Sequence, residues 1–151
     1  MQHHHAHRAH AHDPQARRDG HQIGRGRGVV LHVDDDEACI LGDYVTIGHG
    51  AIVHASTIED NVLVGMGAIV LSGCHIGTGS IIAAGAVVKE NTTIPPYSLV
   101  VGIPARIVRT DESQVERIHN QALKYKHLWT VEYGMLPDCG GEEYDKSAKI
   151  V

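Results

Sequence analysis

The chain has 151 residues, of which 42% are hydrophobic and 4% aromatic, with no Phe and a formal net charge of -5. This length suits one domain, and the negative charge does not provide the basic surface that nucleic-acid binding requires. No apolar run approaches the ~20 residues of a membrane span, and the N-terminus lacks the apolar core of a secretory signal. We therefore expect a cytoplasmic protein with neither nucleic acid nor a membrane as a partner.

Residues 1–28 are rich in histidine, arginine and glycine. Seven of the thirteen histidines lie in this segment, which has no apolar periodicity. Such a composition predicts a disordered tail. A histidine-rich tract can bind metal loosely, but we interpret the tail as separate from the main site.

Residues 29–108 repeat with a period of six. Aliphatic residues and one Thr recur at one phase, and small residues follow four places later in most repeats. The aliphatic phase comprises Val30, Ile40, Thr46, Ile52, Ile58, Val64, Val70, Ile76, Ile82, Val88, Ile94 and Val100. An α-helix would repeat at 3.6 residues and a simple strand at 2. Period six instead predicts an all-β solenoid, a parallel β-helix in which three hexapeptides form one triangular coil and the aliphatics point inward.

The three cysteines, Cys39, Cys74 and Cys139, form neither a CxxC pair nor an even disulfide framework. Disulfides are rare in the cytoplasm. We therefore interpret the three residues as reduced, buried thiols.

Residues 109–134 are predicted to form a C-terminal α-helix. Its apolar stripe, spaced by three and four residues, comprises Val115, Ile118, Ala122, Tyr125 and Trp129. Asp111 is a candidate N-cap, with Gln114 as its capping-box partner, and Gly134 fits the helix end. This helix should pack along a face of the coil, either its own or that of a neighbouring subunit. Residues 135–151 are polar, and we predict a loose tail.

Three histidines cluster around an acidic loop at residues 34–37. His32, His49 and His54 all fall off the aliphatic phase, so their side chains should point out of the coil. His32 and His54 are 22 residues apart, which equals one 18-residue coil plus the four loop residues. His32 should therefore lie directly under His54, at the strand spacing of ~4.8 Å. Two imidazoles stacked in this way can contact one metal ion.

His49 precedes His54 by five residues, and a corner of the coil lies between them. It cannot easily reach the same ion within its own subunit, but a neighbour related by a three-fold axis could supply it. The spacing therefore predicts a homotrimer with metal sites between subunits, each made of His32 and His54 from one chain and His49 from the next. The alternative is three solvated surface histidines.

Several motifs in this region resemble one known family. A first histidine precedes the acidic loop, residues 47–54 read IGHGAIVH, and residues 64–73 read VGMGAIVLSG. Residues 94–108, IPPYSLVVGIPARIV, and residues 116–134, ERIHNQALKYKHLWTVEYG, continue the match. Over about 105 residues the chain resembles the γ-class carbonic anhydrases. The IGHGAIVH motif is specific, whereas the bare hexapeptide repeat is shared with many acyltransferases.

The resemblance implies a left-handed coil followed by a C-terminal α-helix. It implies that His32, His49 and His54 are the ligands of zinc, with iron or cobalt as possible replacements. The implied activity is that of a hydro-lyase, the reversible hydration of carbon dioxide to bicarbonate by a metal-bound hydroxide. Some members have an acidic proton shuttle three residues after the first ligand. Asp35 stands there and is a candidate shuttle; the alternative is a solvated loop charge.

The N-terminal part departs from the family pattern. Family members usually carry two or more further coils before the first ligand, with stretches that hold water and substrate near the metal, and this chain has residues 1–28 instead. One alternative is therefore a catalytically weak, metal-binding trimeric scaffold. The other is a hexapeptide-repeat acyltransferase that uses His49 or His54 as a general base, which leaves the third histidine unexplained.

Overall fold

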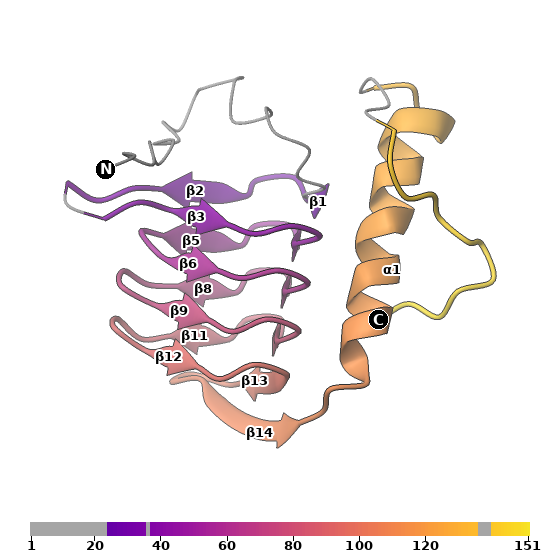
Figure 1. The fold of residues 1–151 in the computed structure, drawn as a ribbon. Coiled ribbons are helices and arrows are strands. Elements are labelled where there is room, and N and C mark those ends of the chain that lie inside the picture. Colours follow the sequence, from indigo (N-terminus) through magenta and orange to yellow (C-terminus); the bar gives the residue numbers. More distant parts are fainter. Residues whose placement is uncertain (1–23, 36, 136–139) are drawn as a thin grey trace, which may run out of the picture.

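The computed structural model describes residues 24–35, 37–135 and 140–151, so residues 1–23 and Cys139 lie outside the described part. Its short strands wind into a parallel β-solenoid of about four turns, followed by a C-terminal helix (Figure 1). The first sheet contains β1 (Gly24–Arg25), β4 (Thr46–Ile47), β7 (Leu63–Val64), β10 (Ile81–Ile82), β13 (Ser98–Val101) and β14 (Arg106–Thr110). The second contains β2 (Val30–His32), β5 (Ile52–His54), β8 (Ile69–Val70) and β11 (Val87–Val88). The third contains β3 (Ile40–Leu41), β6 (Thr57–Ile58), β9 (His75–Ile76) and β12 (Thr93–Ile94). The predicted solenoid followed by a helix is confirmed.

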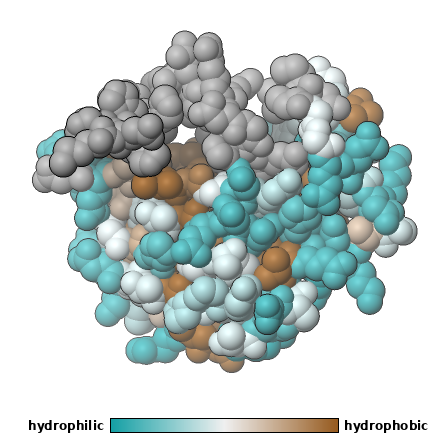
Figure 2. Space-filling model, in the orientation of Figure 1, coloured by the Kyte–Doolittle hydropathy of each residue, from teal (hydrophilic) through white to brown (hydrophobic). Residues whose placement is uncertain are grey.

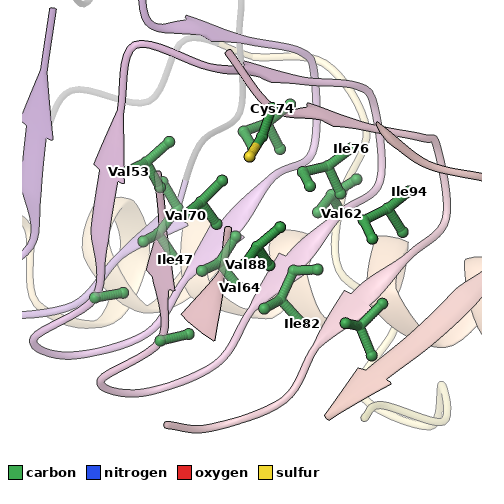
Figure 3. Close-up of a cluster of buried hydrophobic side chains, with 14 of the residues drawn as sticks. Ile47, Val53, Val62, Val64, Val70, Cys74, Ile76, Ile82, Val88 and Ile94 are labelled. Atoms are coloured by element: carbon green, nitrogen blue, oxygen red, sulfur yellow. The ribbon is translucent and has the colours of Figure 1, made fainter. Parts of the chain in front are cut away.

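The interior is filled mainly by branched aliphatic side chains from the strands, with small residues between them. Val53, Val70 and Val88 come from successive strands of the second sheet and are all fully buried. Figure 3 shows these side chains gathered inside the coil with those of Ile76 and Ile94 from the third sheet. Branched aliphatics suit this interior because strands buried on both faces favour such residues.

The predicted inward phase is correct from Ile58 onward but wrong by one residue before it. Val30 and Ile40 are 44% and 48% exposed, whereas Ile47 and Val53 are buried. The inward positions are thus the residues that follow Val30, Ile40, Thr46 and Ile52.

A short corner explains this shift. The inward positions Val53 and Ile58 are five apart in the sequence, whereas later inward positions are six apart. Ala55 lies in this corner with a φ of 42°, a left-handed conformation that few residues other than glycine adopt. Counting back from Ile58 in steps of six therefore reaches residues that lie one position before the inward ones.

The C-terminal helix packs on the first sheet of its own coil. β14 pairs antiparallel with β13 and includes residues 109–110, which were predicted to be helical. Helix α1 (Gln114–His127) then runs back alongside the coil and ends in a π-helical turn, Leu128–Glu132 (Figure 1). Its buried apolar residues are Ile118, Ala122 and Leu123. Within the described part of the chain, no helix has the length and apolar character that crossing a membrane requires.

The predicted capping box at the start of α1 is wrong. Ser113 is the N-cap residue, and Oδ1 of Asp111 accepts hydrogen bonds from its N–H and its hydroxyl. The side chain of Gln114 does not reach back to Asp111, although its backbone N–H donates to the carbonyl oxygen of Asp111 at 3.3 Å. Its buried side-chain amide donates instead to the carbonyl oxygen of Gly79 at 2.8 Å. The Gln114 amide therefore provides a hydrogen-bond donor for a backbone carbonyl group at a corner of the coil that the helix covers.

Both ends of the described chain hold more structure than predicted. Residues 24–28, assigned to the tail, include β1, and the N–H of Gly26 donates to the carbonyl oxygen of Ile47 at 2.8 Å. At the other end, residues 140–151 lie against α1. Nζ of Lys126 donates to the carbonyl oxygen of Gly140, and Nε2 of His119 lies 2.8 Å from Oε2 of Glu142.

Candidate metal centre

His32 and His54 stack on the outer surface of the second sheet. The register of β2 and β5 makes them direct partners, and their ring centroids lie 4.8 Å apart with 26° between the ring planes. Both rings point outward because the preceding residues, Leu31 and Val53, pack in the core. The stacking predicted from the 22-residue spacing is confirmed.

The two rings face each other through nitrogen atoms. Nδ1 of His32 lies 3.0 Å from Nε2 of His54, within hydrogen-bond distance. Two nitrogens bound to one zinc ion at about 2.1 Å and a tetrahedral angle would be about 3.4 Å apart. The observed distance is shorter by a few tenths of an ångström, so the two nitrogens would have to move apart by that amount to share one ion.

The opposite nitrogen of His54 has its own partner. Nδ1 of His54 lies 2.8 Å from the hydroxyl oxygen of Ser72, which is 18 residues further along the chain. Ser72 stands just before the corner at Gly73, whose φ is 70°. The hydroxyl was missed from the sequence, although the 18-residue spacing is the signal that could have found it.

His49 lies at the corner between β4 and β5 and is exposed. Its Nδ1 accepts a hydrogen bond from the backbone N–H of Arg27 at 2.7 Å. A neutral His49 in this position therefore carries its proton on Nε2. To bind a metal through Nε2, the ring would have to release the Arg27 N–H or lose that proton.

A single chain brings together two of the three predicted ligands. Among the described residues, no group of three or more His, Cys, Asp or Glu side chains is arranged to hold a metal ion. His49 does not join His32 and His54 within one chain, as the corner between them predicted. Its ligand role, like that of the other two histidines, stays a prediction.

Asp35 is exposed in the loop between β2 and β3. Its backbone N–H donates to Oδ1 of Asp34 at 2.9 Å, and the N–H of Asp34 donates to the carbonyl oxygen of Glu37. These contacts fold the loop into a local turn beside His32. Its carboxylate is open to solvent, and its shuttle role stays a prediction.

His75 provides a useful contrast because it belongs to the third sheet. His75 pairs in register with Thr57 of the neighbouring strand. Its Nε2 lies 2.6 Å from Oε1 of Glu59. The hydrogen bond from His75 holds the pKa of the Glu59 carboxyl below its ordinary value. His75 is therefore an outward histidine with a carboxylate partner, on a different face from the candidate site.

The three outer faces of the coil differ in polarity. Helix α1 covers the first sheet and presents a mainly hydrophilic outer side (Figure 2). The third sheet exposes one aliphatic residue, Ile40, together with His75 and Thr93. The second sheet carries a column of outward aliphatic residues beside the histidines: Val30, Ile52, Ile69 and Val87. It is thus the most apolar of the faces that the described chain leaves uncovered.

Comparisons with known proteins point in two directions. The repeat family described as bacterial transferase hexapeptide (six repeats) matches residues 55–90. A protein named probable carbonic anhydrase from Methanocaldococcus jannaschii is 50% identical over 100 residues, which are 66% of this chain and 63% of that protein. Mitochondrial gamma carbonic anhydrase 1 of Arabidopsis thaliana is 44% identical over 91 residues, which are 59% of this chain and 33% of that protein.

Solved structures share the architecture. A hexapeptide transferase family protein from Anaplasma phagocytophilum superposes with a TM-score of 0.65 at 29% identity, covering 77% of this chain and 67% of that one. The chain spans less than two thirds of the length of either carbonic anhydrase relative.

Proposed function

Because the chain belongs to the γ-class carbonic anhydrase family of hexapeptide-repeat proteins, we propose that it is a metalloenzyme that interconverts carbon dioxide and bicarbonate. The observation that carries this proposal is the His32–His54 pair, whose facing nitrogens lie 3.0 Å apart. Zinc is the proposed metal, and iron or cobalt suits the same imidazole ligands. The proposed location is the cytoplasm, which suits Cys39 and Cys74 as buried free thiols.

Three residues of this chain have proposed parts in the reaction. When bound, a divalent zinc ion would supply a nucleophile at neutral pH by lowering the pKa of water to about 7. His32 and His54 would hold the ion, each through a nitrogen that faces the other ring. Asp35 is exposed beside His32 and is the proposed acceptor of the proton that hydration releases.

The third ligand is proposed to be Nε2 of His49 from a neighbouring subunit, which requires the ring to release the Arg27 N–H that its Nδ1 accepts. The protein is therefore expected to be a homotrimer. The aliphatic column on the second sheet supports this arrangement, because burying it between subunits would remove apolar surface from water beside the histidines. Light scattering should give three times the chain mass of 16.3 kDa. A monomer that still binds metal at full strength would rule out a shared site.

Metal content and carbon dioxide hydration test the proposed activity. The histidine-rich N-terminus would contaminate a metal analysis, so the full chain is used with its first seven histidines, all in residues 1–23, replaced by Ala. This tail-substituted chain is expected to bind about one zinc ion per subunit and to accelerate carbon dioxide hydration in a stopped-flow assay. Tight zinc binding without hydration would favour the metal-binding scaffold.

The transferase alternative has one observation in its favour. The repeat family that matches residues 55–90 and the Anaplasma neighbour are both described as hexapeptide transferases. Under this alternative, His49 or His54 would act as the general base for acyl transfer. Calorimetric titration with acetyl-CoA separates the two functions, since the carbonic anhydrase proposal expects no binding.

A further inference from the structure

The hydroxyl oxygen of Ser72 lies 2.8 Å from Nδ1 of His54, on the side of the ring away from His32. We propose that Ser72 is a positioning residue: it accepts the Nδ1–H of His54 and thereby directs the lone pair of Nε2 toward His32 and the metal. This inference rests on the proposed function, because it concerns the same metal site.

The argument begins with the two nitrogens of the His54 ring. Nδ1 faces the Ser72 hydroxyl at 2.8 Å, and Nε2 faces Nδ1 of His32 at 3.0 Å. A neutral imidazole carries one proton, and the other nitrogen has the lone pair. Ligation through Nε2 requires the proton on Nδ1, where it needs an acceptor. Ser72 supplies that acceptor.

Ser72 can take this role because of its chemistry and its surroundings. A hydroxyl can both accept and donate, so it can receive the Nδ1–H and direct its own hydrogen elsewhere. Ser72 is half-buried, and water can therefore accept that hydrogen. Metal-bound histidines almost always donate their second N–H to such a partner.

His49 shows the opposite arrangement. Its Nδ1 faces the backbone N–H of Arg27, which can only donate, so the lone pair is held on Nδ1. The backbone N–H of Arg27 requires the lone pair of His49 on Nδ1, whereas a hydroxyl can also accept an Nδ1–H. At His54 the partner permits the tautomer that binds metal through Nε2.

The backbone around Ser72 holds the hydroxyl in place. The carbonyl oxygen of Ser72 accepts the N–H of Asn91 at 2.9 Å, and the N–H of Gly73 donates to the carbonyl oxygen of Ala55 at 2.9 Å. These bonds tie Ser72 to the coils on both sides. The ring of His54 is therefore oriented by the packed coil.

The test compares Ser72→Ala with Ser72→Thr in the tail-substituted chain. Zinc affinity is measured by chelator competition, and the protonated ring nitrogen of His54 is identified from imidazole ¹⁵N shifts in the metal-free protein. We expect Ser72→Ala to weaken zinc binding by about tenfold or more and to reduce the Nδ1–H form of His54. Ser72→Thr keeps a hydroxyl and should stay within about threefold of the parent. Thr93→Ala, which removes an exposed hydroxyl from the third sheet, should leave both measurements unchanged.

The outcomes separate this inference from the proposed function. If the parent binds zinc and Ser72→Ala binds it equally well, the positioning role is wrong and the proposed function stands. If the parent binds no zinc, the proposed function fails, and the nitrogen shifts still decide the role of Ser72. The positioning role of Ser72 would be overturned if His54 of the parent protein is protonated on Nε2, or if Ser72→Ala leaves the tautomer of His54 unchanged.

Discussion

His32→Ala, His49→Ala and His54→Ala are each expected to remove most of the zinc from the tail-substituted chain. A catalytic zinc ion usually has three protein ligands, so loss of any one leaves too few. The coil should survive, because these side chains point outward and His32 and His49 are exposed. Metal analysis after dialysis measures the loss, and circular dichroism checks that the solenoid is retained.

His75→Ala is the matched control. His75 is also an outward histidine of the coil, but it lies on the third sheet and contacts Glu59. This variant should keep its zinc, and loss of the exposed ion pair should cost less than about 1 kcal/mol. Retention of zinc by His49→Ala alone would show that the site lies within one chain. Retention by all three ligand variants would place the metal elsewhere and favour the transferase alternative.

Val64→Asp is expected to unfold much of the protein. Val64 has no exposed surface and lies between Ile47 and Ile82, its partners in the coils on either side. An unpaired carboxyl group at this position costs several kcal/mol or must be protonated. Folded domains are stable by only about 5–15 kcal/mol, so the loss should be large. Thermal and urea denaturation measure it.

Thr93→Asp is the control for this substitution. Thr93 is exposed and precedes the buried Ile94 in β12, so the new carboxylate would remain in water. Its effect on the free energy of unfolding should be about 0.5 kcal/mol or less. Equal melting temperatures for the two variants would mean that Val64 does not point into the core.

The sequence by itself determined the repeating architecture and one pair in the candidate site. A six-residue period repeated over about four turns predicts a solenoid because each hexapeptide must bury one aliphatic side chain. The spacing of His32 and His54 predicted their stacking because parallel strands pair residues a whole coil apart. Both predictions depend on distances along the chain, which a sequence displays directly.

The tertiary structure decided what counting could not. At the corner that contains Ala55, successive inward positions are five residues apart and not six. The inward positions before this corner therefore differ by one residue from those that a strict period of six predicts. The tertiary structure also placed the Ser72 hydroxyl at one nitrogen of His54 and the Arg27 N–H at one nitrogen of His49. Which nitrogen is free depends on atoms contributed by neighbouring coils. Periodicity predicts which residues lie on a face, whereas only the packed coils determine which atom of a ring meets a donor and which meets an acceptor.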